Sequence, residues 1–249
     1  MIQKIINKEL LENRKESEIK SWRSSGLGSC LTSRYLERAG VKADSDFDER
    51  TLRVFSVGVM LEDWVVELLG KQEGVKFTTQ IALEAPKLDF TGHLDLWMTK
   101  PEEVVYEFKS KHSRAFWYMD RQKEGANKQH QMQLWSYLWL TGVNKGVIVY
   151  ISKDDLAILE YPIFRNDKDL EEAVMNELLV LNESWKQKLP PPPIRWDFKE
   201  KKFVELKKTD WQYTYSRWGK QIFKQEKYLD LATVQLWSEA ESGNLLNKN

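Results

Sequence analysis

The sequence predicts an α/β (α+β) fold in which a central mixed β-sheet is flanked by helices. Two observations predict it. Segments of helical and strand-like periodicity follow one another over the first 189 residues, in the order helix, three strands, helix and strand pair. Hydrophobic residues make up 41% of the 249 residues and charged residues 31%. A chain of this size and composition can bury a sizeable core without disulfides.

Each element follows from its hydrophobic period and its turn residues. Ser24, Ser25 and Gly26 mark an entry into the second helix, and residues 84–87, which include a proline, mark a turn between two strands. The predicted helices cover residues 2–22, 27–39, 51–71, 128–140 and 167–188, and the predicted strands cover residues 75–83, 88–98, 104–109, 146–152 and 156–161.

Composition excludes several classes of protein. No apolar run reaches the length of a membrane span, the charged N-terminus does not resemble a signal peptide, and Cys30 is the only cysteine. We therefore expect a reducing, cytoplasmic setting (the host cytoplasm for a viral protein) and no membrane partner. The 38 basic residues balance 38 acidic ones, so any nucleic-acid surface must be local.

Four consecutive prolines, Pro190 to Pro193, divide the chain. Proline continues neither a helix nor a central strand. We predict a core with N-terminal helices over residues 1–189 and an extension over residues 190–249 that packs on it. From Lys186 to Lys227 the chain has twelve Lys and Arg against five Asp and Glu, interleaved with aromatic residues. Such a segment is typical either of a single-strand binding surface or of a solvated helical hairpin.

Polar residues interrupt the apolar faces of two helices. In the helix over 51–71, Glu62 lies in the apolar half, one turn after Gly58. A carboxylate there is costly unless it is paired or binds a metal ion. In the helix over 128–140, Gln133 and Tyr137 lie on one side with His130. Taken singly, each is equally well explained as a buried side chain whose hydrogen bonds are satisfied.

Two strands carry acidic residues in alternation with apolar ones. His93 and Asp95 share one face of the strand over 88–98, and Glu107 and Lys109 share one face of the strand over 104–109. Alone, Glu-x-Lys is a weak signal that an ordinary ion pair would explain. Neighbouring strands would, however, place Asp95 and Glu107 near one cation, and hard carboxylate oxygens suit Mg²⁺ or Mn²⁺. This chemistry is typical of phosphoryl transfer.

Gly92–Asp95, Glu107–Lys109 and His130–Tyr137 together resemble the motifs Gly-x-x-Asp, Glu-x-Lys and His-x-x-Gln-Leu-x-x-Tyr. These are motifs of the PD-(D/E)XK nuclease superfamily, in its RecB-like branch with the lambda-type exonucleases and the CRISPR-associated four-cysteine nucleases. The resemblance covers roughly residues 20–165. It implies a restriction-endonuclease-like core of order αβββαβ.

The resemblance also implies roles for the residues. Asp95 and Glu107 would be metal ligands together with the Phe108 carbonyl, with Glu62 as a further carboxylate and His93 as an additional candidate. Lys109 would position or activate water, and Gln133 and Tyr137 would hold Lys109 and a DNA phosphate. The cluster-containing relatives use four cysteines, whereas only Cys30 is present here. We therefore expect Mg²⁺ or Mn²⁺ and no iron–sulfur cluster, with Cys30 as a small buried residue.

Several further residues are candidates for contact with DNA. Arg23, Ser25 and Ser29 lie near a predicted helix start, where backbone amides could bind a phosphate. An ordinary serine cap explains the two serines equally well. The full set of candidates for DNA or phosphate binding is Arg23, Ser25, Ser29, Arg34, His130, Trp211, Tyr215 and Arg217.

The expected function is a Mg²⁺-dependent deoxyribonuclease, an exonuclease in recombination or repair and perhaps of phage type. Its expected partners are DNA ends and either further copies of the chain or a recombination protein. Three alternatives stay open: a structure-specific or nicking endonuclease with the same site, a nuclease-fold protein that binds DNA without cutting it, and an unrelated α/β domain with accidental motifs.

Overall fold

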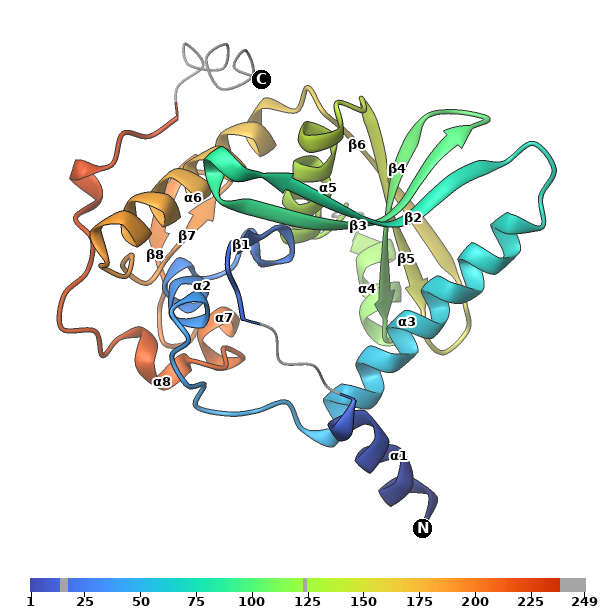
Figure 1. The fold of residues 1–249 in the computed structure, drawn as a ribbon, viewed down its shortest axis with the longest axis horizontal. Helices are drawn as coiled ribbons and strands as arrows, with labels where there is room; N and C mark the ends of the chain where they lie inside the picture. Colours follow the sequence, from blue (N-terminus) through green and yellow to red (C-terminus); the bar gives the residue numbers. More distant parts are fainter. Residues whose placement is uncertain (14–17, 123–124, 238–249) are drawn as a thin grey trace.

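The computed structural model describes residues 1–13, 18–122 and 125–237. The protein contains both helices and strands along the chain, as predicted for an α/β fold (Figure 1). In chain order they are α1 (Ile2–Glu12), β1 (Trp22–Arg23), η1 (Ser24–Gly26), α2 (Leu31–Arg38), α3 (Glu49–Gly70), β2 (Lys76–Ala85), η2 (Pro86–Leu88), β3 (Phe90–Lys100), β4 (Val104–Lys111), α4 (Ser113–Gln122), α5 (Lys128–Thr141), β5 (Lys145–Ser152), β6 (Ile158–Phe164), α6 (Lys168–Gln187), β7 (Ile194–Asp197), β8 (Lys202–Glu205), α7 (Trp211–Thr214), α8 (Gly219–Ile222) and η3 (Leu231–Thr233).

The main sheet is mixed, as predicted, and its strands run in the order β1-β3-β4-β5-β6 with β2 also paired to β3. β2 pairs antiparallel with β3 along nearly its whole length. The other edge of β3 is shared: β1 pairs in parallel at Phe90 and Thr91, and β4 pairs antiparallel from Leu96 to Met98. Among the described residues, the segment of β3 between Thr91 and Leu96 therefore has no strand partner on that edge.

Side-chain caps fix the starts of the three long helices. Asp48 accepts from the amide of Thr51 at α3, Asn127 from Gln129 at α5, and Asp167 from Leu170 at α6. Each cap satisfies an amide that has no partner within the helix.

The sheet is covered on both faces, and β5 shows this best. Val147, Val149 and Ile151 pack with Leu61 and Val65 of α3. The alternate residues Ile148 and Tyr150 belong to the main core, with α5 and α6. A strand that is buried on both sides reads as a continuous apolar run, as this one does. Figure 1 shows α3 on one side of the sheet and α5 and α6 on the other.

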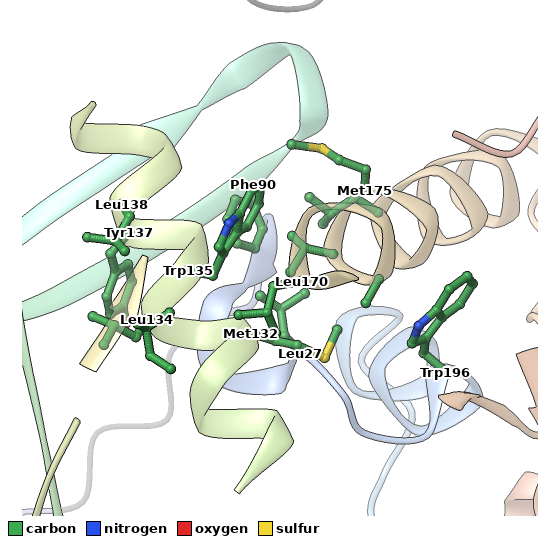
Figure 2. Packing of buried hydrophobic residues seen from close by; sticks show 14 of the residues in the cluster. Leu27, Phe90, Met132, Leu134, Trp135, Tyr137, Leu138, Leu170, Met175 and Trp196 are labelled. Atoms are coloured by element: carbon green, nitrogen blue, oxygen red, sulfur yellow. The ribbon is translucent and has the colours of Figure 1, made fainter. Parts of the chain in front are cut away.

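The main core forms around α5 (Figure 2). Met132, Leu134, Trp135 and Leu138 of this helix are at most 1% exposed. They pack with residues from the N-terminal segment, β3, α6 and the C-terminal extension, namely Leu27, Phe90, Leu170, Met175 and Trp196. Elements that are distant in sequence therefore share one core.

Residues of the extension beyond Pro190 contribute to this core. Ile194, Trp196, Leu229 and Trp237 belong to the main cluster. The proline backbone also takes part, because the carbonyl of Pro191 accepts from the Thr32 hydroxyl at 3.0 Å. Figure 1 shows β7, β8, α7 and α8 gathered beside α2 and α6, away from α3. The segment is a hairpin followed by short helices, so the helical hairpin interpretation is wrong.

Some predicted elements need correction. α1 ends at Glu12, and Trp22 and Arg23 are a short strand where the sequence predicted the end of a helix. α2 begins at Leu31 and not at Leu27, because residues 24–26 form a 3₁₀ turn. α4 was not predicted. The apolar face expected on α3 is partly exposed. Val54 and Leu68 are each 41% exposed, whereas Leu61 and Val65 pack on the sheet.

No helix among the described residues is long and apolar enough to span a membrane.

Candidate active site

The predicted residues Asp95 and Glu107 meet where β4 separates from β3. The ladder between these strands ends at Leu96 and Tyr106. One step beyond it, the amide of Phe108 donates to Oδ2 of Asp95 at 2.8 Å. The carboxylate of Asp95 thus accepts a hydrogen bond that a backbone carbonyl of β3 would accept in a regular β-ladder. Burial raises the pKa of Asp95, against the lowering effects of the Phe108 amide and Lys109.

Glu107 and Lys109 project from β4 beside Asp95 and form a buried pair. Nζ of Lys109 lies 2.5 Å from Oε1 of Glu107, and the Glu107 side chain is 1% exposed. Oε2 of Glu107 is buried without a hydrogen-bond partner. Burial raises the pKa of Glu107 above its usual range, and Lys109 opposes the shift. Burial acts to lower the pKa of Lys109, but Glu107 outweighs it and the pKa is raised, so the ammonium stays charged.

Glu62 reaches the same place from α3. Burial and the neighbouring charge of Asp95 raise the pKa of Glu62 to about 7. The side-chain amide of Gln80 on β2 donates to Oε1 of Glu62. Gln80 has a φ of 54°, between the paired residues Thr79 and Ile81. A non-glycine residue in this left-handed region is uncommon. No motif or periodicity in the sequence indicated Gln80.

Tyr137 and Gln133 of α5 close the free edge of β3. The hydroxyl of Tyr137 donates to the carbonyl of His93 at 2.8 Å, and Nε2 of Gln133 donates to the same hydroxyl. Ser24 donates to it at 2.9 Å. The tyrosine therefore binds the stretch of β3 that has no strand partner, just before Asp95. Sequence reasoning identified Gln133 and Tyr137 but missed Ser24, whose partner lies 113 residues away.

His130 and His93 differ in their surroundings. Nδ1 of His130 lies 2.7 Å from the Tyr150 hydroxyl, which also accepts from the amide of Asn127. Burial, followed by the positive charges of Lys109 and Lys111, lowers the pKa of His130 to about 3. His130 is thus neutral and orients the start of α5. The side chain of His93 is exposed.

The predicted phosphate pocket near residue 23 is not assembled as expected. Arg23 and Ser25 are exposed on β1 and η1, five or more residues before α2 begins. Ser29 donates to the carbonyl of Gly26. Arg34 requires a correction: its guanidinium is buried and lies 3.0 Å from Oε2 of Glu177, which also accepts from the amide of Gly28. Arg34 is bound inside the protein and is not presented to a phosphate.

The candidate DNA-binding residues of the extension differ in their surroundings, although the amide of Tyr215 donates to the carbonyl of Trp211 at 2.9 Å. Trp211 and Tyr215 are 57% and 82% exposed. Arg217 instead holds a loop, donating to the carbonyl of Ser45 and to Asp46, so its predicted contact with DNA is not supported by its surroundings. Cys30 is buried against Leu206 and Ile222 of the extension, and burial raises the pKa of its thiol.

The donor set at the site fits a hard divalent cation only in part. Within residues 1–13, 18–122 and 125–237, no group of three or more His, Cys, Asp and Glu side chains is arranged to hold a metal ion. Glu62, Asp95 and Glu107 therefore do not form such a group, and Oε1 of Glu62 accepts from Gln80. Mg²⁺, however, needs only one or two carboxylates and keeps several waters. The unpartnered oxygen of Glu107 beside Asp95 meets that need.

Comparisons with known proteins detect similarity of fold. No protein-family model matches the chain. No curated protein matches it either. Among solved structures, SSO0001 aligns with a TM-score of 0.49 and 19% identity, covering 87% of this chain and 94% of its own. An alkaline exonuclease from Laribacter hongkongensis aligns at 0.47 and 16%, covering 67% and 92%. A phage-related exonuclease from Haemophilus somnus aligns at 0.43 and 15%, covering 68% and 94%. A shared fold does not by itself establish an activity.

Proposed function

We propose that this chain is a Mg²⁺- or Mn²⁺-dependent deoxyribonuclease that degrades DNA from its ends, with a role in recombination or repair. The observation that carries the proposal is the group of Asp95, Glu107 and Lys109 at the separation of β3 and β4. Glu107 is buried there with one carboxylate oxygen that has no partner, and the half-buried side chains of Asp95 and the charged Lys109 lie beside it. Buried charges are retained at such a cost mainly where they are used.

Each residue has a part in the hydrolysis of a phosphodiester. Asp95 and Glu107 would hold the cation, with the Phe108 carbonyl as a further ligand and Glu62 acting as a nearby acid. A bound Mg²⁺ would polarise the phosphate and lower the pKa of a water. Lys109 is fixed by Glu107 and offers its ammonium to the attacking water and to charge that develops on the phosphate. Gln133 and Tyr137 fix the edge of β3 from which Asp95 projects.

The test is digestion of end-labelled linear DNA beside covalently closed circular DNA, with Mg²⁺ or Mn²⁺. We expect loss of the linear DNA alone, and no activity in Lys109→Ala. Lys145→Ala is the matched control, because Lys145 lies on β5 and pairs with Glu102 at the surface. Thermal unfolding of both variants shows that they are folded.

Other outcomes would contradict parts of the proposal. Cutting of the circles would favour the structure-specific or nicking endonuclease. DNA binding without cleavage of either substrate would favour a nuclease-fold protein that only binds DNA. Activity that survives in Lys109→Ala would show that this site is not the active site.

A further inference from the structure

A cavity of about 1420 Å³ lies beside the catalytic strand and outside the group of carboxylates. One wall is α4 together with the start of α5. The other comes from the C-terminal extension, through the segment after β7 and the start of α7. Trp196, which is labelled in Figure 2, anchors the second wall in the main core. Two parts of the chain that are remote in sequence thus enclose one space.

The charge of this cavity differs from that of the whole protein. Its lining carries two acids, Asp197 and Asp210, and both accept hydrogen bonds from backbone amides of their own loops. Against them stand six cations, Lys111, Arg114, Arg121, Lys128, Arg195 and Lys199. A neutral chain therefore concentrates positive charge where a polyanion could enter.

Aromatic side chains face the cavity from both walls. Trp117 and Tyr118 of α4 are 39% and 59% exposed, and Trp211 of α7 is 57% exposed. Trp117 is held by a hydrogen bond from Nε1 to Asp155 at 3.1 Å and by an edge contact with Phe116. Its ring is therefore fixed in place although it is exposed. Unpaired bases stack on such rings, whereas the bases of a duplex keep their faces within the helix.

The cavity lies two residues along β4 from Lys109 of the candidate active site. Glu107, Lys109 and Lys111 are every second residue of this strand, so their side chains lie on the same face. Lys111 is the first residue of the cavity lining on that strand, and at about 3.3 Å per residue it lies about 7 Å beyond Lys109. A strand of DNA at Lys109 would reach the cavity with its next nucleotides.

From this geometry we infer that the cavity between α4 and the C-terminal extension binds single-stranded DNA adjoining the scissile phosphate. Bases stack on Trp117 and Trp211, and the lysine and arginine side chains contact the phosphates. Gln212, beside Trp211, ties this wall to the N-terminal segment, because its Nε2 donates to the carbonyl of Gly28. The inference rests on the proposed nuclease function. It specifies that the DNA substrate is single-stranded beside the scissile phosphate.

The test measures binding of a labelled single-stranded oligonucleotide by fluorescence anisotropy, in EDTA so that no cleavage occurs. We expect Trp211→Ala to weaken binding at least about fivefold, the lower range for loss of one stacking residue. Phe164→Ala is the matched control, since Phe164 is 50% exposed on β6 and lies outside the cavity. It should bind as the unaltered protein does.

A second pair of variants tests the phosphate contacts. Arg114→Gln with Lys199→Gln removes two cavity cations, and Lys168→Gln with Lys186→Gln removes two surface cations of α6 that pair with acids. The logarithm of the binding constant decreases as the logarithm of the salt concentration rises. In the first pair of variants this slope should become less steep by about 1.4, at about 0.7 per phosphate contact. It should stay unchanged in the second pair.

Failure of this inference can be told from failure of the proposed function. Unchanged affinity in Trp211→Ala, or a blunt duplex that competes as well as the single strand, would overturn the cavity assignment, whatever the cleavage assay shows. Weakened single-strand binding in Trp211→Ala together with cleavage that survives Lys109→Ala would support the cavity and overturn the catalytic site.

Discussion

The amide of Phe108 donates to Oδ2 of Asp95 at 2.8 Å, at the point where the ladder between β3 and β4 ends. One carboxylate oxygen is thus tied to the backbone, and the Asp95 side chain is fixed at the place where the two strands diverge. Glu107 lies close by, since, besides burial, the charge of Asp95 contributes to the raised pKa of Glu107.

The first prediction separates the structural role of Asp95 from its chemical one. Asp95→Asn keeps an oxygen that accepts from Phe108, so the free energy of unfolding should stay within about 1 kcal/mol of the original. Nuclease activity should fall at least about 100-fold, the upper end of what loss of a partner of a metal ligand costs. Asp95→Ala should in addition lose about 1–3 kcal/mol of stability, because the Phe108 amide is then unpaired. Chemical denaturation and the digestion assay check both. Full activity in Asp95→Asn would remove Asp95 from the site.

The second prediction concerns metal binding at Glu107. Mg²⁺ or Mn²⁺ should raise the Tm, with about 2.7 kcal/mol of stabilisation at a hundredfold excess over Kd. In Glu107→Gln this increase should disappear. In EDTA the variant should be less stable than the original, since the charged Lys109 then loses the carboxylate that holds it. Glu160→Gln, an exposed residue of β6, is the control and should keep the metal response. An equal metal response in Glu107→Gln would contradict the assignment.

The hydrophobic periodicity of the sequence alone predicted most of the sheet and most of the helices that cover it. The period of two along β3 and β4 placed Asp95, Glu107 and Lys109 correctly on their strands, because a strand fixes side-chain direction by alternation. The long helices were found because each presents an apolar stripe over three or more turns. α4 was missed because it is short and only Phe116 and Met119 are buried on it.

The rest depended on tertiary relationships that a single sequence does not show. The two-residue strand β1 exists only because β3 offers it a free edge. Arg34 appeared to be a cation for DNA because its partner, Glu177, lies 143 residues away on α6. Gln80 carries no local signal for a positive φ. Such residues are recognised only when the elements that hold them are in place.

The third prediction concerns Gly92, the glycine of the Gly-x-x-Asp motif. A Cβ at this position would lie 2.5 Å from Cε1 of Tyr137 and 3.2 Å from Oγ of Ser24. Gly92→Ala should therefore displace Tyr137, cost about 1–3 kcal/mol of stability and lower the nuclease activity. Thermal unfolding and the digestion assay measure the two effects. Gly70→Ala is the control, because its Cβ would meet nothing closer than Phe77 at 4.0 Å. A fully stable, fully active Gly92→Ala would show that this close approach is not needed.

The fourth prediction assigns Arg34 to stability. Arg34→Met leaves the carboxyl of Glu177 buried without the guanidinium that lowers its pKa, which should cost about 3–5 kcal/mol. Adding Glu177→Gln replaces that carboxyl with an amide and keeps an acceptor for the amide of Gly28, so the double variant should recover most of the loss. Urea denaturation of the two single variants and the double variant measures the coupling. If Arg34→Met instead weakens DNA binding at unchanged stability, Arg34 belongs to a binding surface after all.

The fifth prediction is a pH dependence that arises at His130. The pKa of His130 is about 3 in the folded protein, mainly through burial, against about 6.5 in an unfolded chain. Between these values the unfolded state binds a proton that the folded state does not. The free energy of unfolding therefore falls as the pH falls from 6.5 towards 3, by up to about 1.4 kcal/mol per pH unit. His130→Gln removes this contribution and keeps a polar group near the Tyr150 hydroxyl. Relative to the original protein, the variant should gain stability steadily as the pH is lowered from 7 to 4, measured by urea denaturation at each pH. Two parallel stability curves would mean that His130 takes up its proton in the folded state as readily as in the unfolded one.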